Sequence, residues 1–410
     1  MKLHSLRCLL FFLLTIATFP CLAKTETVYI DDIIYNIDTE SATASVAMQN
    51  PYAQTPNVPI VIIPESVTSK GETYPVVALE DKAFYNCSKL TKVVIPNSVV
   101  SIGEKAFRYC PSLVDVTLPE NLKSLSRFMF DGCTALETID LPTNIKSIPE
   151  FTFSQCESLK SIVIPDGVET IGGQAFQYTY RLSTITLPPS LKEINGTLSD
   201  ARYPLIPTIH ISDLNAFCNI DTQHSRLCGN SVWYLYLNGE EVTDVKIPEG
   251  TEDINIWDGC ESLKSIATPN SVTICRFDNS NLSFISMSSA TKEVEIGGIE
   301  DYNLKRVDIY ALEPPKLTTS DWQVREAVLH VPVGRKEVYQ NNEEWSIFST
   351  IIDDLTGESG VSQIQVDIDS SLPVEVFNLN GVKIGNSISN LPAGLYILRQ
   401  GSTAKKIAVK

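Results

Sequence analysis

Side chains suited to acid–base or nucleophilic chemistry are few and widely separated in this 410-residue sequence. Beyond the first 23 residues there are three histidines, His210, His224 and His330, whose spacing matches no metal-binding or catalytic motif. Neighbouring acids such as Asp353-Asp354 would point to opposite faces of a strand, so they cannot act together as general acid and base. No CxxC pair is present that would bind zinc. We therefore predict a protein that is not an enzyme and that uses no metal and no cofactor.

Aromatic residues suited to binding stand together at Trp233, Tyr234 and Tyr236. In a strand, Trp233 would face the opposite side from the two tyrosines, so at most one of these sets is buried. The segment either faces a ligand or packs its rings into an irregular repeat, and the sequence leaves both interpretations open. Just before it, Cys218 and Cys228 flank a polar loop and are the pair that we expect to form a disulfide, if the protein contains one.

A strict 23-residue period sets the positions of many other residues. Four residue types keep this interval in phase, which predicts a solenoid of stacked units that cannot bury their apolar faces alone. The period is lost between Asn195 and Glu240. The residues in phase are Pro96, Pro119, Pro142, Pro165 and Pro188; Phe84, Phe107, Phe130, Phe153 and Phe176; Cys87, Cys110, Cys133 and Cys156; and Leu90, Leu113, Leu136, Leu159 and Leu182.

Each unit is interpreted as two short strands and a turn around a shared core. The alternating segment from Val116 to Leu118 is typical of a strand with one buried side, and the proline after it ends the strand. A second extended piece, such as Val99 to Ile102, and a glycine turn follow. The segment that carries the in-phase phenylalanine and cysteine suits a single turn of α- or 3₁₀-helix. We predict a mainly β fold with a continuous core.

The in-phase cysteines would form a buried ladder. Equivalent Cα atoms in adjacent coils lie roughly 4.7–4.9 Å apart, a distance that permits disulfide pairing. Stacked side chains point the same way, however, and Thr179 fills the same position in the next coil. Free buried thiols that act as small hydrophobic groups are therefore the favoured interpretation.

Outward residues of the predicted strands alternate with the buried aliphatic residues and form columns. They are small, β-branched or weakly charged, with no aromatic platform for sugars and no basic stripe for phosphate. Such a surface suits a protein or an extended polymer better than a small molecule, but it is equally the solvated face of a sheet. The candidate binding residues are Lys92, Asp115, Thr117, Thr138, Asp140, Ser161, Thr184 and Thr186, together with Trp233, Tyr234 and Tyr236.

The segment IPNSVVSIGEKAFRYCPSL, residues 95–113, resembles the consensus of the BspA-type, or Treponema-type, leucine-rich repeat family of bacterial surface proteins. The close match covers residues 79–194, and looser copies follow around residues 246–272. The resemblance implies a leucine-rich repeat solenoid on the surface of a Bacteroidota-like cell. It also implies non-enzymatic binding of host or bacterial macromolecules.

The N-terminus predicts export. Lys2, Arg7, an apolar run and small residues up to Ala23 are typical of a secretory signal peptide, with a buried N-terminal helix as the alternative. No second long apolar run follows, so we expect no transmembrane segment. Removal of the signal leaves 30 Lys and Arg against 49 Asp and Glu, a net charge of −19. This acidity argues against nucleic acid or an anionic membrane as a partner.

The two ends of the solenoid and the C-terminus also resemble known modules. The resemblance implies a β-hairpin cap that turns at Asp31-Asp32, and a closing unit in which Tyr339, Trp345 and Phe348 plug the open core. Residues 362–410 resemble the sorting domain of type IX secretion, through Asn380-Gly381, Leu391, Gly394-Leu395-Tyr396 and the Lys405-Lys406 strand. This module either directs export or simply ends the chain as a small sandwich domain.

These observations predict the following organisation and function. The chain divides into a signal peptide (1–23), an N-terminal β cap (24–60), a solenoid (61–356), a linker (357–361) and a C-terminal β module (362–410), with the solenoid irregular at 195–245 and closed by 305–356. We expect an exported, cell-surface or secreted adhesin-like protein that recognises other proteins through the solenoid face. A glycan-binding protein in nutrient capture is the alternative, and an enzyme with an unrecognised site is a third.

Overall fold

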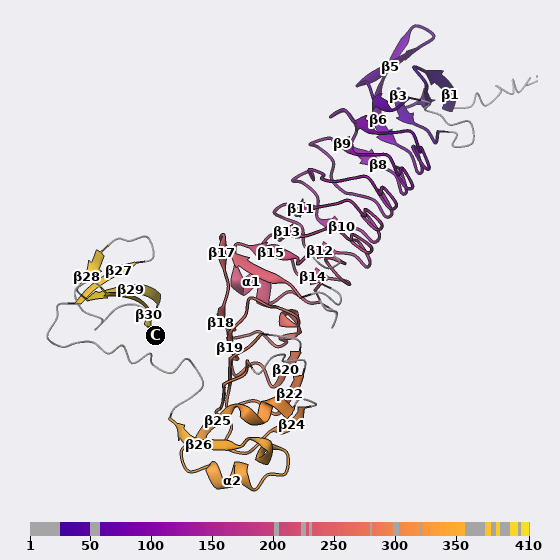
Figure 1. The fold of residues 1–410 in the computed structure, drawn as a ribbon. Helices are drawn as coiled ribbons and strands as arrows, with labels where there is room; N and C mark the ends of the chain where they lie inside the picture. The colour runs from indigo at the N-terminus through magenta and orange to yellow at the C-terminus, as the bar shows by residue number, and fades with distance from the viewer. Residues whose placement is uncertain are drawn as a thin grey trace, which may run out of the picture.

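The fold is mainly β, and its coils stack into an elongated solenoid (Figure 1). The signal peptide, the linker and the residues Asn380-Gly381 and Leu391 lie outside the part of the chain that the structure describes. The computed structural model describes residues 25–49, 58–200, 205–222, 227–228, 232–278, 281–297, 303–319, 322–356, 374–378, 383–385, 394–400 and 403–409.

One side of the solenoid, which we call the strand face, consists mainly of parallel strands from successive coils (Figure 1). Each strand forms because an aliphatic residue, such as Val116 or Ile185, alternates with outward residues and enters the core. The first sheet holds β4 (Ile60–Ile62), β7 (Lys92–Val94) and β9 (Asp115–Thr117). The second holds β11 (Ser161–Val163), β13 (Thr184–Thr186), β15 (Thr208–Ile211), β16 (Tyr234–Leu237) and β17 (Glu240–Glu241). The third holds β18 (Asp244–Lys246), β19 (Ser265–Ala267), β21 (Phe284–Met287), β23 (Arg306–Ile309), β25 (Val328–Pro332) and β26 (Thr350–Leu355).

Other strands form further sheets along the solenoid. They arise from the second extended piece of each coil, where Ile148, Ile171 and Ile194 enter the core. One sheet contains β10 (Ser147–Ile148), β12 (Thr170–Ile171) and β14 (Glu193–Ile194). Another contains β20 (Ile274–Asp278), β22 (Glu293–Gly297) and β24 (Lys316–Thr319), and β8 (Ser101–Ile102) pairs with a strand of the N-terminal cap.

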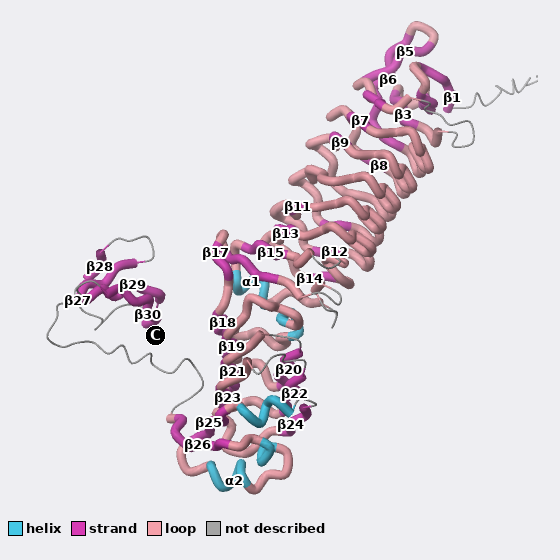
Figure 2. The backbone as a smooth tube through the Cα atoms, in the orientation of Figure 1, coloured by secondary structure: helices cyan, strands magenta, loops and turns pink. Residues whose placement is uncertain are grey.

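The segment with the in-phase phenylalanine differs from the expected helical turn. Lys105 and Tyr109 both lie at φ 60°, in the left-handed region, which interrupts a right-handed helix. The backbone instead bonds from coil to coil, as Phe107 N–H does to the Met129 carbonyl at 3.0 Å. Figure 2 accordingly shows turns along the regular coils. Among the described residues, short helices lie elsewhere: α1 (Leu214–Cys218), η1 (Asn255–Trp257), η2 (Trp322–Glu326), α2 (Lys336–Gln340) and η3 (Trp345–Ile347).

Two ladders fill the core of the regular coils. The rings of the in-phase phenylalanines stack at centroid distances of 5.4–5.6 Å from Phe84 to Phe176. The thiols of Cys110, Cys133 and Cys156 each donate to a phenylalanine carbonyl one coil back, at 3.0, 3.2 and 3.3 Å. All are buried and free, which confirms the expectation of unpaired thiols.

The N-terminal cap is a sheet that turns from antiparallel hairpins into the solenoid. It contains β1 (Thr25–Ile30), β2 (Ile33–Asp38), β3 (Thr43–Val46), β6 (Glu72–Leu79) and β5 (Ser66–Ser69) in that order. The hairpin of β1 and β2 turns at Asp31-Asp32, with φ of 48° and 64°, as the resemblance implies.

The closing unit buries the three aromatic side chains that the resemblance singles out. The Tyr339 hydroxyl donates to the Ala311 carbonyl at 2.8 Å, and Trp345 Nε1 donates to the Pro315 carbonyl at 2.6 Å. Phe348 stacks on Trp345 with ring centroids 5.7 Å apart. These side chains are therefore part of the core rather than an exposed aromatic site.

The C-terminal residues form an antiparallel four-stranded sheet. Its order is β28 (Lys383–Gly385), β27 (Val374–Asn378), β29 (Gly394–Gln400) and β30 (Thr403–Val409).

Candidate binding groove

The strand register aligns the outward residues of the strand face into columns. Ser161, Thr184, Thr208 and Tyr234 lie opposite one another in successive strands. A second column runs through Val163, Thr186, His210 and Tyr236. The predicted outward residues of the regular coils are all half-buried or exposed: Lys92, Asp115, Thr117, Thr138, Asp140, Ser161, Thr184 and Thr186.

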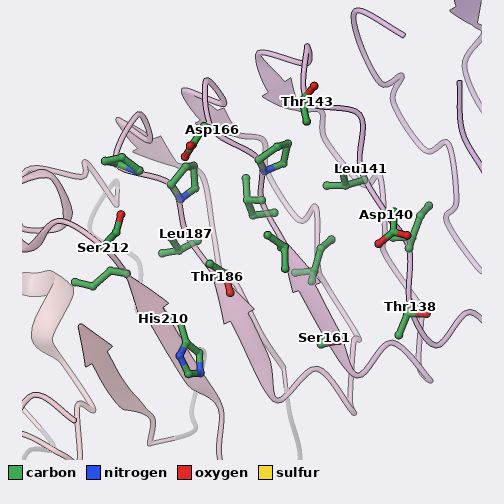
Figure 3. Close-up of a pocket in the computed structure, with 18 of the residues that line it drawn as sticks. Thr138, Asp140, Leu141, Thr143, Ser161, Asp166, Thr186, Leu187, His210 and Ser212 are labelled. Carbon is green, nitrogen blue, oxygen red and sulfur yellow. The ribbon is translucent and has the colours of Figure 1, made fainter. Parts of the chain in front are cut away.

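An open groove of about 970 Å³ follows these columns from residues 138–143 across β11 and β13 to β15. Figure 3 shows Asp140 and His210 at opposite ends of this row. Hydroxyl groups of Thr138, Ser161 and Thr186 line it, and the Val163 side chain is 63% exposed. The turn of the β16–β17 hairpin, Asn238-Gly239, also lines the groove and belongs to the irregular stretch of the sequence. The groove thus joins regular coils to the segment that interrupts them.

Two exposed carboxylates, Asp140 and Asp166, are the charged side chains that line the groove. Neither forms a hydrogen bond or ion pair with the part of the chain that the structure describes, and the lining includes no lysine or arginine. Outside the groove on the same face, the Asp115 carboxylate pairs with Lys92 Nζ at 2.6 Å. The groove therefore carries an unbalanced negative charge.

An aromatic pair stands at one end of the columns. The His210 and Tyr236 rings stack with centroids 5.1 Å apart and an interplanar angle of 17°. Burial, with the nearby carboxylates of Glu261 and Glu241, raises the pKa of Tyr234 in the neighbouring column. Sequence reasoning treated the tyrosines as separate from the columns, because the register across the interrupted period emerges only when the coils are stacked.

Trp233 is not a binding residue, contrary to its place among the candidates. Its side chain is fully buried, and its Nε1–H donates to the Asp258 carbonyl at 2.9 Å. Phe217 packs against it edge to face, with ring centroids 6.3 Å apart. The alternation predicted that Trp233 and the two tyrosines face opposite sides, and the structure confirms this. Tyr234 and Tyr236 are half-buried on the strand face.

The candidate disulfide between Cys218 and Cys228 is absent, since both residues are free, buried thiols. Burial, with a small contribution from Asp213, raises the pKa of Cys218 to about 12. Burial raises the pKa of Cys228 well above its usual range. Both side chains enter the core beside the interrupted coils.

A polar cluster on the third sheet escaped sequence reasoning. The Arg306 guanidinium donates two hydrogen bonds to the buried Asp308 carboxylate, from Nε at 2.7 Å and Nη2 at 3.0 Å. His330 lies beside Asp308 in the register, and its Nδ1 is 2.8 Å from Asp354 Oδ1. A register shift in β25–β26 leaves Asp354 without an opposite residue, and its side chain meets His330. The side chains of this cluster therefore pair with one another.

Within the described ranges, no three His, Cys, Asp or Glu side chains are arranged to hold a metal ion. The described helices are also too short or too polar to cross a membrane.

The stacked coils, the strand face and the in-phase core residues define a leucine-rich repeat solenoid. The chain belongs to the BspA type leucine rich repeat family, whose model matches residues 77–198 and 233–316 in six copies. The unmatched residues between these ranges include α1 and the Cys218–Cys228 segment, where the period fails.

The chain is also similar to solved leucine-rich repeat proteins, whereas no curated protein matches it. A T. pallidum leucine-rich repeat protein is 26% identical, with 45% of this chain and 86% of that chain covered and a TM-score of 0.36. One from Bacteroides ovatus is 24% identical, covers 80% and 100%, and has a TM-score of 0.42. A leucine-rich cell surface protein from Faecalibacterium prausnitzii is 21% identical, covers 81% and 95%, and has a TM-score of 0.39.

Proposed function

We propose that this chain is an exported, non-enzymatic protein of the bacterial surface or its surroundings that recognises other proteins through the groove on the strand face. Membership of the BspA type family supports a binding role for the repeats. The predicted signal peptide supports export. The C-terminal module, if it acts as a sorting domain, supports surface attachment.

The groove is the observation that carries this proposal. It crosses four successive coils and is open along its length, so it suits an extended segment of a partner better than a compact small molecule. Its hydroxyl groups, exposed valine and two free carboxylates offer hydrogen bonds, apolar contact and charge within one surface. Protein interfaces combine these same three kinds of contact.

Glycan recognition is the second candidate, and the His210–Tyr236 stack favours it. Aromatic faces at the end of a row of hydroxyl groups provide a platform on which a sugar ring can lie. This function predicts dependence on the aromatic rings rather than on the carboxylates.

Binding of the purified chain to a panel of immobilised extracellular-matrix proteins and polysaccharides tests the proposal. Thr186→Trp fills the centre of the groove, and we expect it to weaken protein binding at least tenfold. Thr117→Trp adds the same ring to an exposed strand position outside the groove, so it should bind like the wild type. Equal binding by both variants would contradict a role for the groove. Binding to polysaccharides alone, lost in Tyr236→Ala, would replace the protein partner with a glycan.

A further inference from the structure

We propose that the groove holds an extended polypeptide segment by a lysine or arginine side chain that pairs with Asp140 or Asp166. This inference rests on the proposed function and adds the chemistry of the partner. It follows from the distribution of charge, the dimensions of the groove and the groups that line it.

The two groove carboxylates lack the ion pair that several other exposed acids of the regular coils form. Several exposed acids in these coils have a cation one coil away: Glu137 with Lys160, Glu150 with Arg127 and Glu169 with Lys192, at 2.5, 2.5 and 2.8 Å. Asp140 and Asp166 have no such partner among the described residues, although they lie in the same coils. Both are exposed, so they are open to a cation from a partner. A side chain with a positive charge can pair with either of them through a charge-assisted hydrogen bond.

The dimensions of the groove fit an extended peptide. Strands of a sheet lie about 4.8 Å apart, so the three steps from residues 138–143 to β15 span roughly 14 Å. An extended chain covers this distance with about four residues, at about 3.3 Å each. A segment of this length reaches both carboxylates only by crossing the strands, which is the direction in which the groove runs.

The remaining lining groups suit the rest of such a segment. Hydroxyl groups of Thr138, Ser161 and Thr186 recur once per coil and can donate to or accept from the amides of a peptide backbone. The exposed Val163 offers apolar contact to the methylene stem of a lysine or arginine. A neutral glycan would use the hydroxyl groups but would leave both carboxylates without a partner.

Selection of short random peptides displayed on phage tests this inference, with the intact wild-type chain as bait and Thr186→Trp for counter-selection. We expect the selected peptides to be enriched in lysine or arginine. Replacement of that residue by norleucine in a fluorescent synthetic copy should weaken binding about fivefold, measured by fluorescence anisotropy. The double variant Asp140→Asn/Asp166→Asn should also weaken binding about fivefold, because it removes one exposed ion pair whichever of the two carboxylates the cation contacts.

The matched control is Asp115→Asn/Glu157→Gln, which removes two exposed carboxylates outside the groove and leaves the net charge of the two variants equal. It should bind the peptide like the wild type, so general attraction by an acidic protein is separated from pairing in the groove. If selected peptides lack an excess of cations, or if the two double variants bind equally, the inference is overturned while the groove remains a protein-binding site. If no peptide or protein binds and a polysaccharide does, the proposed function fails as well. Thermal unfolding by circular dichroism checks that each variant is folded.

Discussion

The second and third sheets are both built mainly of parallel strands from successive coils, but they use their outward residues in opposite ways. In the second sheet, Thr186 and His210 occupy one column and remain half-open to solvent along the groove. In the third, the corresponding column runs through Ser286, Asp308 and His330, which are exposed by only 3%, 1% and 8%. One face is therefore left open, whereas the other is filled by its own polar side chains.

Under the proposed function, this difference assigns binding to one sheet and stability to the other. The cluster around Arg306 and Asp308 pairs its charges internally and leaves little for a ligand. The groove keeps two carboxylates without partners, which costs little while they are hydrated and becomes useful when a cation approaches. A conventional repeat scaffold thus supports both surfaces, and only the outward residues decide between them.

The largest expected effect concerns the core beneath the two faces. Phe130→Ala removes a buried ring and its stacks on Phe107 and Phe153, and should lower the free energy of unfolding by about 3–5 kcal/mol. Phe277→Ala removes a buried ring on β20, in the same half of the solenoid as the third sheet. This ring stacks on no other ring in the described residues. The substitution should cost about 1–3 kcal/mol less, the contribution of two ring stacks. Denaturant unfolding measures both, and equal losses would show that the ladder adds no stability beyond burial.

The core could be predicted from the sequence because the coils have a constant length. The in-phase phenylalanines and cysteines, such as Phe130 and Cys133, recur at the same positions of successive coils. Aligning the coils therefore predicts that all of them are buried. The left-handed turns could not be predicted in this way. Lys105 and Tyr109 adopt positive φ without being glycine, because coil-to-coil hydrogen bonds hold them there.

The candidate site was predictable only in part, for a related reason. Alternation correctly placed Asp140 and Thr186 outward, since it depends on neighbouring residues alone. The approach of Asn238-Gly239 to the groove and the His330–Asp354 contact depend on how coils of unequal length stack. No local pattern in a single sequence records that register.

The next effect compares an ion pair from each face. Asp308→Asn leaves Arg306 without its buried carboxylate partner, and we expect a loss of about 2–3 kcal/mol, reduced because the guanidinium is partly exposed. Asp115→Asn breaks the exposed pair with Lys92 and should change the stability by less than about 1 kcal/mol. Thermal or denaturant unfolding of both variants measures the difference. Similar losses would mean that the polar cluster of the third sheet is no more important to stability than a surface pair.

The smallest expected effect tests whether the second and third sheets differ only in their outward residues or also in the core beneath them. Burial raises the pKa of Cys133 to about 12, and burial, partly offset by hydroxyl hydrogen bonds, raises that of Cys275 to about 11. A thiol near pKa 9 in the unfolded chain loses its proton first there, so its contribution to stability is complete below pH 9 and falls as the pH rises toward the folded value.

Each of these thiols should therefore cost the folded state about 1.4 kcal/mol on going from neutral pH to pH 10. The free energy of unfolding of the wild type should fall between neutral pH and pH 10. Cys133→Ala and Cys275→Ala should each make this fall smaller by about 1.4 kcal/mol in denaturant unfolding, whatever their effect at neutral pH. We expect equal relief in the two variants because both thiols lie in the same kind of core, under faces that differ only on the outside. If only Cys133→Ala reduces the alkaline loss of stability, the cores beneath the second and third sheets differ as well. The open groove would then reflect a different packing of the whole coil rather than a difference in outward side chains alone.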